Sequence, residues 1–253
     1  MKIIDKIFLW LSYVGAYVHL FFTVLIFAGI GYTTHQLPFT IFGGTLLAIF
    51  LRLNDDLQDV HQDRIAHPQR PFPKGVLTLK EGNAIWWLLF HALWMTALVF
   101  LFFGKIFFLI VFILLLGILK IAPSLRSYPV AKSLLNQTLI LPFALFNPFY
   151  ALLLFGAFAT YDLTRKLDPK IHPILVTPIH YWGYSSVYWF CVGTLAISFI
   201  GALLLGVQIV LFPMQFIVLL SLLIPFTSPK LWEVPHFLAL ISLIVHAWCG
   251  IFL

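Results

Sequence analysis

Charge is what this sequence has least of, because Asp, Glu, Lys and Arg together make up only 9% of its 253 residues. A soluble domain usually carries about 25% charged residues. Hydrophobic residues account for 62% of the chain, and the mean hydropathy is +1.02. The composition therefore excludes an ordinary soluble protein and predicts a polytopic membrane protein. We expect membrane lipids around it and no nucleic-acid partner.

Cysteine is also scarce. The only two, Cys191 and Cys249, both lie in apolar stretches. Two buried thiols are too few for a disulfide framework or a cysteine metal cluster. We interpret both as packing residues.

Long apolar runs, in contrast, are abundant. Stretches that can cross about 30 Å of hydrocarbon occur near 8–31, 38–53, 84–104, 106–120, 184–205, 207–225 and 234–253. All must be helical, since lipid offers backbone polar groups no other partners. The first run is longer than a signal peptide's apolar region and lacks a small-residue cleavage site, so we expect it to be the first membrane helix.

The segment between Lys132 and Asp162 can be read as one long crossing or two short ones. Both of its flanks are basic, and the positive-inside tendency then requires an even number of crossings. Asn147-Pro148 is the expected tip of a short hairpin. The sequence thus predicts an all-α bundle of about nine transmembrane helices, of which the fifth and sixth are short.

With nine helices, every basic loop falls on one side of the membrane and only Lys105 falls opposite. This asymmetry predicts a cytoplasmic N-terminus and cytoplasmic acidic segments. We expect the protein in the bacterial inner membrane.

Four of the nine acidic residues lie close together, at Asp55, Asp56, Asp59 and Asp63. On a helix, the last three fall within an arc of roughly 60°. Carboxylates on one stripe repel each other unless cations bind them. Magnesium is typically held by one or two carboxylates, waters and a substrate phosphate, so the stripe predicts a metal site.

The loop after this stripe is rich in proline and in cations, with Pro68, Pro71 and Pro73 around Arg70 and Lys74. The prolines end the helix and favour an extended loop. Cations beside metal-binding carboxylates form a clamp for a diphosphate, because they neutralise charge as the leaving group departs.

These motifs resemble those of the UbiA-type intramembrane prenyltransferases. Asp55-Asp56-x-x-Asp59-x-x-x-Asp63, followed by Arg70-Pro71, is similar to the family's first signature, with Asp55 where Asn is usual. Tyr128-x-x-x-Lys132 is similar to its Tyr-x-x-x-Lys segment, and Tyr161-Asp162 lies where its second aspartate motif belongs.

The resemblance implies one membrane-embedded domain over residues 1–253, a helical bundle around a central cavity. It implies Mg²⁺-dependent transfer of an isoprenyl group from an isoprenyl diphosphate to a lipophilic, aromatic acceptor. The implied metal ligands are Asp56, Asp59, Asp63 and Asp162, and the implied diphosphate contacts are Arg70 and Lys132, joined through proximity by Arg165 and Lys166.

The second motif departs from the family pattern. The family usually has two aspartates four residues apart, whereas here Asp168 follows Asp162 by six. Three alternatives stay open: a single-metal site, a site in which Arg165 and Lys166 replace part of the metal's charge, or a chain that binds isoprenoids without catalysis. The segment 170–183 is either an interfacial aromatic belt or a lid.

Other classes of membrane protein also place ionisable residues at helix ends. Inverted internal repeats in the sequence would favour a transporter, and we see none. A phosphoalcohol transferase would carry an Asp-Gly-x-x-Ala-Arg pattern, which is absent. The alternatives that remain are a membrane transporter and a non-catalytic isoprenoid- or lipid-binding protein.

Overall fold

The computed structural model describes residues 3–13, 16–125, 128–168 and 178–253, and these residues form helices without any strand. The α-helices are α1 (Ile3–Tyr13), α2 (Ala16–Thr33), α3 (Leu37–Ala66), α4 (Leu79–Phe102), α5 (Ile106–Ile121), α6 (Pro129–Gln137), α7 (Pro148–Thr164), α8 (Pro178–Leu205), α9 (Gln208–Ser221), α10 (Ile224–Thr227) and α11 (Glu233–Ala247). Short 3₁₀ helices are η1 (Ala122–Leu125), η2 (Thr138–Leu145), η3 (Arg165–Leu167), η4 (Pro229–Leu231) and η5 (Cys249–Ile251).

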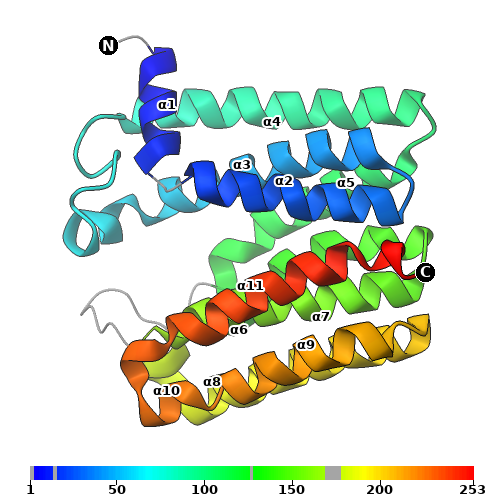
Figure 1. The fold of residues 1–253 in the computed structure, drawn as a ribbon. Coiled ribbons are helices and arrows are strands. Elements are labelled where there is room, and N and C mark those ends of the chain that lie inside the picture. Colours follow the sequence, from blue (N-terminus) through cyan, green and yellow to red (C-terminus); the bar gives the residue numbers. More distant parts are fainter. Residues whose placement is uncertain (1–2, 14–15, 126–127, 169–177) are drawn as a thin grey trace.

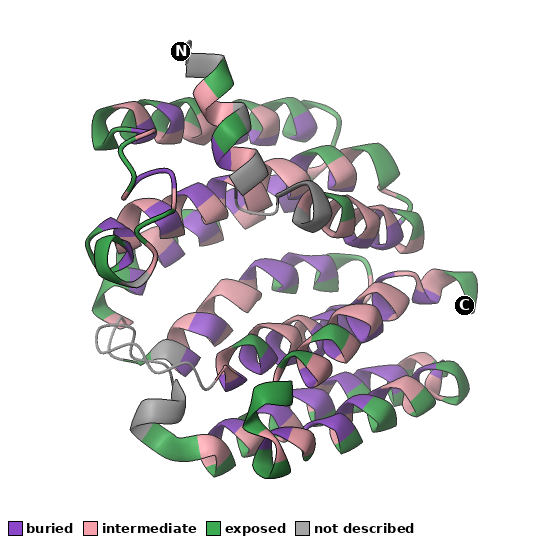
Figure 2. Ribbon diagram, turned by 60° about the vertical axis from the view of Figure 1, so that its left-hand side comes forward, coloured by how far each residue is buried: buried purple, intermediate pink, exposed green. Residues whose placement is uncertain are grey.

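The predicted all-α membrane bundle is confirmed. Six of the described helical segments are long and apolar enough to cross a membrane, and two shorter apolar segments, Leu20–Thr33 and Val130–Leu145, accompany them. Large apolar side chains such as Phe102, Ile209 and Trp189 point outward, and exposed residues follow the outer helix faces (Figure 2). Such a surface suits lipid rather than water.

One expectation about the first apolar run is wrong. Residues 8–31 do not form a single helix, because α1 ends at Tyr13 and α2 begins at Ala16. Helix α1 lies across the direction of the other helices (Figure 1). It buries Trp10 and forms an ion pair between Lys6 and Glu81 of α4 at 2.6 Å. The burial of Trp10 and the ion pair of Lys6 with Glu81 therefore hold α1 against the end of the bundle.

The short hairpin between Lys132 and Asp162 is confirmed. Helices α6 and η2 make the first arm, and α7 makes the second. Asn147 starts α7, because its side chain accepts hydrogen bonds from the backbone N–H groups of Phe149 and Tyr150. Pro148 follows at the first helical position, where no N–H is needed.

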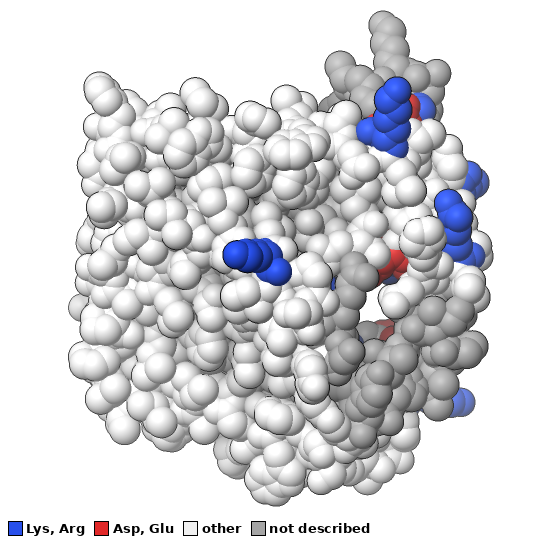
Figure 3. Space-filling model, turned by 180° about the vertical axis from the view of Figure 1, so that it is seen from behind, with Lys and Arg blue, Asp and Glu red and all other residues white. Residues whose placement is uncertain are grey.

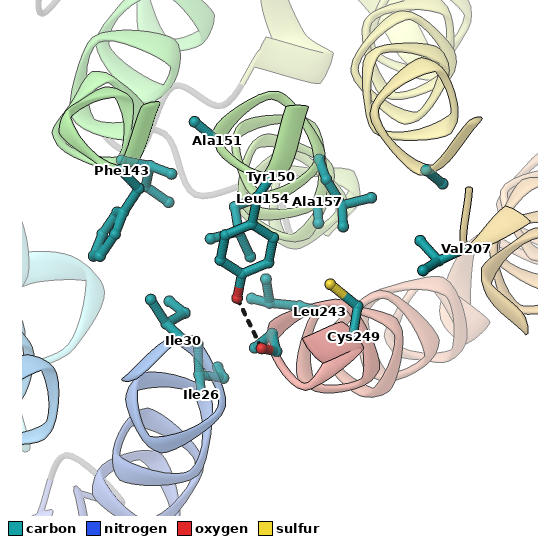
Figure 4. Packing of buried hydrophobic residues seen from close by; sticks show 14 of the residues in the cluster. Ile26, Ile30, Phe143, Tyr150, Ala151, Leu154, Ala157, Val207, Leu243 and Cys249 are labelled. Carbon is teal, nitrogen blue, oxygen red and sulfur yellow. Dashed lines mark hydrogen bonds between the residues drawn. The ribbon is translucent and has the colours of Figure 1, made fainter. Parts of the chain in front are cut away.

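The helices form two groups with a cavity between them. Helices α2 to α5 lie on one side and α7 to α11 on the other (Figure 1). Tyr150 of α7 joins its neighbour α11, since its hydroxyl donates a buried hydrogen bond of 2.8 Å to the Ala247 carbonyl (Figure 4). Seven elements contribute to the cavity wall, namely α2, α3, α4, α5, the α6–η2 arm, α7 and α11.

Helices α7 and α8 pack with their backbones almost touching. A Cβ atom on Gly156 would lie 2.4 Å from the backbone nitrogen of Ser198, and one on Gly201 would lie 2.6 Å from that of Leu153. Small residues permit this approach, which is a common way for membrane helices to associate. The Thr160 and Thr194 hydroxyls, 2.9 Å apart, add a buried hydrogen bond across the same contact.

Candidate active site at the acidic end of the bundle

The central cavity has a volume of about 240 Å³ and a largely apolar wall. Its aromatic side chains are Phe22, Phe27, Phe107, Phe108, Phe112, Phe143, Phe158 and Tyr161. Two glycines of α3 allow rings of the wall to lie directly against this helix: a Cβ on Gly43 would lie 2.5 Å from the Phe108 ring, and one on Gly44 would lie 2.3 Å from the Phe27 ring. The cavity thus suits an apolar chain.

The cavity wall reaches the acidic motifs on both sides of the bundle. On α3 the last lining residue is Leu51, four residues before Asp55. On α7 it is Tyr161, which directly precedes Asp162. Figure 3 shows acidic side chains above and below a hollow in one face of the molecule, with basic side chains nearby. The apolar cavity therefore lies beside a charged region.

Asp162 is held by three partners from two helical segments. The Ser133 hydroxyl of α6 donates to one carboxylate oxygen. Arg165 lies 3.1 Å from the other oxygen, and the Lys166 ammonium lies 3.8 Å from the first. The negative charge of Asp162 raises the pKa of Arg165, whereas burial lowers the pKa of Lys166 against the attraction of Asp162. The predicted grouping of Asp162, Arg165 and Lys166 is therefore present.

The packing of η3 fixes these two cations. Leu167 is buried in an apolar cluster with Val130, Leu163 and Val187. Its carbonyl accepts a hydrogen bond of 2.8 Å from the Tyr184 hydroxyl of α8. With Leu167 anchored, Arg165 and Lys166 stay beside the carboxylate of Asp162.

Asp55 connects the acidic end of α3 with the opposite group. Its carboxylate lies 3.7 Å from the Lys132 ammonium of α6, and its side chain is 42% exposed, which leaves room for further ligands. The charge of Asp55 also acts on Arg165 and Lys166. Sequence reasoning did not assign Asp55 a role, although its position four residues after a cavity-lining leucine is a helical signal for it.

Asp56 and Asp63 lie further round α3 and are both buried. Asp56 accepts a hydrogen bond of 2.8 Å from the Trp10 indole and forms a 2.8 Å ion pair with Arg52. At Asp63, one Arg70 nitrogen donates to both carboxylate oxygens, at 2.9 and 2.7 Å. Each of these two aspartates is therefore paired with a positively charged arginine, and Asp56 also accepts a hydrogen bond from Trp10.

The loop that carries Arg70 is folded back on α3. Phe72 is buried beside Leu53 and Val60 of that helix. Gly75 has a φ of +77° and closes a turn by donating its N–H to the Phe72 carbonyl. Glycine reaches this conformation without strain, so the turn is stable. Arg70 is consequently directed to Asp63, which engages one nitrogen of its guanidinium group.

The residues at the cavity end of α3 fit a hard cation in their chemistry. Counting 100° per residue from Leu51, Asp55 and Asp59 turn about 40° and 80° away, and Gln58 about 20° in the other direction. The Gln58 side-chain oxygen is buried and accepts no hydrogen bond. Within the described ranges, no three His, Cys, Asp or Glu side chains form a ready metal cluster. Magnesium needs fewer, since waters and phosphate oxygens complete its coordination.

The segment predicted as a belt or lid, residues 170–183, lies mostly outside the described residues, which resume at Pro178. Gly183 then interrupts α8 with a φ of +73°. Cys191 and Cys249 are both buried free thiols, as expected for packing residues.

Comparison with known proteins bears on the fold. No protein-family model matches the sequence, and no curated protein sequence matches it. Among solved structures, the chain is similar to one described as "Structural and mechanistic insights into the biosynthesis of Digeranylgeranylglyceryl phosphate synthase in membranes", with a TM-score of 0.64 and 14% sequence identity. The superposition covers 96% of this chain and 99% of the other. The chain therefore shares its fold over nearly its whole length with the protein of that structure.

Proposed function

We propose that this chain is a Mg²⁺-dependent membrane prenyltransferase, which moves an isoprenyl group from an isoprenyl diphosphate to a lipophilic, aromatic acceptor. The observation that carries the proposal is the apolar central cavity, whose wall ends beside the charged groups around Asp55 and Asp162. An isoprenyl diphosphate has the same division, an apolar chain joined to a polyanion. The shared fold with a solved prenyl-lipid synthase supports the proposal.

In this proposal the cations hold the diphosphate. Lys132, Arg165 and Lys166 lie around the carboxylates at the cavity end and supply positive charge. Their charge stabilises the diphosphate as the bond between the allylic carbon and its oxygen breaks and both electrons leave with the diphosphate. Arg70, engaged by Asp63, would contribute mainly by fixing the loop over this end.

We propose that Asp55, Asp59 and Asp162, with the Gln58 oxygen, supply the ligands for Mg²⁺. When bound, the metal neutralises the diphosphate oxygens and so eases departure of the leaving group. Asp56 and Asp63, also assigned to the metal by the sequence pattern, would act by orienting α3 through Arg52 and Arg70. In this proposal, the positive charges of Arg165 and Lys166 compensate for the second aspartate that the family's second motif usually has and this chain lacks at the expected spacing.

The allylic cation left behind would be stabilised by aromatic faces in the cavity. Phe22 of α2 and Phe158 and Tyr161 of α7 line it, and the ring of Tyr161 stacks on His236 at 4.8 Å. Aromatic faces attract cations and, unlike water, do not consume them. The acceptor then forms its new bond to the allylic carbon and loses a proton.

We further propose that residues 1–253 act as one membrane-embedded domain, with the N-terminus and the acidic motifs on the cytoplasmic side of a bacterial inner membrane. The distribution of basic loops supports this orientation. In this orientation, the water-soluble diphosphate product would be released directly into the cytoplasm.

The test uses the purified full-length chain in lipid nanodiscs. Isoprenyl diphosphates of several lengths are supplied with aromatic acceptors and with prenyl glyceryl phosphates, and diphosphate release and prenylated product are measured. Turnover should require Mg²⁺ and stop with EDTA. If a broad panel gives neither turnover nor Mg²⁺-dependent diphosphate binding, the enzyme proposal fails; binding without turnover would instead support a non-catalytic isoprenoid-binding protein.

A further inference from the structure

The wall of the central cavity also contains polar side chains. These are Thr23, Thr40, Thr96, Asn136, Gln137 and Tyr161. The hydroxyls of Thr40 and Thr96 are used within their own helices, since each donates at 2.7 Å to a carbonyl oxygen one turn earlier. Asn136 and Gln137, the last two residues of α6, bring carboxamide groups to the wall, and these can both donate and accept hydrogen bonds.

The two carboxamides are unpaired but accessible. Both side chains are half-buried. In the part of the chain that the structure describes, no hydrogen bond joins either carboxamide to another group. Their polar atoms keep accessible surface, unlike the Gln215 oxygen of α9, which is buried and unpaired. A molecule that lies against this end of α6 can therefore reach them.

The direction of the Asn136 side chain follows from its neighbours on α6. The Lys132 ammonium lies 3.7 Å from Asp55 of α3. The Ser133 hydroxyl donates to Asp162 of α7. At 100° per residue, Asn136 points between these two side chains, about 40° from Lys132 and about 60° from Ser133. It therefore faces the space between the two groups of helices, where the cavity lies.

Asn136 also lies at a defined depth. It is about 6 Å along α6 from Lys132, toward the apolar part of the cavity. Helical side chains lean toward the N-terminus of their helix, which for α6 is the charged end. The carboxamide thus lies just inside the cations that hold the diphosphate in the proposed function, beside the first carbons of an isoprenyl chain. Gln137 is about 140° round the helix from Lys132 and points away from this place.

An isoprenyl diphosphate does not satisfy the Asn136 side chain. Ionised diphosphate oxygens only accept hydrogen bonds, and the isoprenyl chain has no polar group, so the Asn136 oxygen still lacks a donor. A charged donor would be costly against the apolar wall. A hydroxyl group donates without bringing a charge. The molecule that complements Asn136 is therefore a second, neutral substrate that carries a hydroxyl.

We propose that Asn136 recognises the acceptor, by accepting a hydrogen bond from the acceptor's hydroxyl group at its side-chain oxygen. This inference rests on the proposed function, because it names the polar group of that reaction's acceptor and the residue that selects it. A hydroxyl held at Asn136 lies one helical turn inside Lys132, next to the expected position of the allylic carbon. Phenols and lipid alcohols share this group, and the experiment distinguishes them.

The experiment measures binding without turnover. The full chain in nanodiscs, with Mg²⁺ and inorganic diphosphate, is titrated with two matched pairs of probes, and binding to empty nanodiscs is subtracted. The pairs are naphthol with methoxynaphthalene, and hexadecylglycerol with its dimethyl ether. Each ether keeps the apolar part but lacks the donor. In one pair or both, the hydroxyl probe should bind about three- to tenfold more tightly than its ether, the value of one hydrogen bond. A preference in the naphthol pair indicates a phenolic acceptor, and one in the glycerol pair indicates a lipid alcohol.

Asn136→Leu keeps the approximate size of the side chain but removes its oxygen. It should abolish the preference and leave binding of the ethers within about twofold of wild type. Asn136→Ala should act in the same way and guards against misfolding, since alanine favours a helix and adds no bulk. Gln208→Leu makes the same carboxamide-to-leucine change outside the cavity and should bind like wild type. The melting temperature of each variant checks that it is folded.

Equal binding of hydroxyl and ether in both pairs overturns the inference, as does a preference that persists in Asn136→Leu and Asn136→Ala. Either result leaves the prenyltransferase proposal standing if the acceptor panel gives turnover. A preference that depends on Asn136 in a chain without turnover supports the hydroxyl site, although prenyl transfer itself would then fail. The two proposals are therefore tested separately.

Discussion

The two groups of aspartates at one end of the bundle differ in how their charge is balanced. Asp56 and Asp63 of α3 are buried and held at 2.7–2.9 Å by fixed partners. Asp55 is 42% exposed and lies 3.7 Å from Lys132, and Asp162 is paired with Arg165 and Lys166 of the adjoining segment at 3.1 and 3.8 Å. The acidic run of α3 therefore holds two buried carboxylates with close protein partners and one partly exposed carboxylate, Asp55, near the end of the cavity wall.

The strongest test of this difference is Asp162→Asn. The change keeps the shape of the side chain but removes the charge that balances Arg165 and Lys166. We expect kcat/KM for prenyl transfer to fall about 100-fold or more, as for loss of a major electrostatic group. Asp168→Asn is the control, and we expect it to stay within about threefold of wild type. A fully active Asp162→Asn enzyme would remove Asp162 from the site.

Asp63→Asn tests one of the two buried aspartates of α3. It leaves Arg70 without the carboxylate that accepts two of its hydrogen bonds. We expect the free energy of unfolding to fall by about 2 kcal/mol, the usual value of a charged hydrogen bond. Thermal unfolding in detergent would measure it, and the Mg²⁺ concentration for half-maximal activity should change little. A large rise in that concentration with unchanged stability would show instead that Asp63 is a metal ligand.

Asp55 can be tested with a pair of variants. Asp55→Ala removes a carboxylate that faces Lys132, whereas Asp55→Asn keeps one oxygen at the same place. We expect the alanine variant to need about tenfold more Mg²⁺, a loss of about 1.4 kcal/mol in metal binding. The asparagine variant should lie between alanine and wild type. Identical titrations for all three proteins contradict a metal role for Asp55.

The smallest effect is expected for Trp10→Phe, which removes only the indole N–H that donates to Asp56. Stability should fall by about 1 kcal/mol, and the activity per folded molecule should stay within about twofold. Measuring both the melting temperature and the specific activity separates an effect on stability from an effect on catalysis. Activity lost without a change in stability would mean that α1 positions the reacting groups directly.

The sequence predicted the parts of this molecule that depend on local pattern. The apolar runs, the turn at Asn147 and the grouping of Asp162 with Arg165 and Lys166 all follow from neighbours in the chain. The different directions of α1 and α2 were missed because apolar residues continue from one helix into the other. The contact of Asp55 with Lys132 was missed because a helical stripe does not say which of its sides faces a cavity.

Hydrogen bonds between helices that are distant in the sequence could not be predicted, for a different reason. The buried hydrogen bond of His246 in α11 is an example. Its partner Gln215 lies 31 residues away on another helix. Only the packing of α9 against α11 brings the two together, and no local periodicity records that packing.

The glycine contacts between α7 and α8 also divide the space available to lipid. With the two backbones this close, no acyl or isoprenyl chain can pass between these helices. The central cavity is lined by α7 but not by α8, whereas a separate apolar groove is lined by residues of α8 and α9. A lipophilic molecule must therefore reach the cavity between other helices.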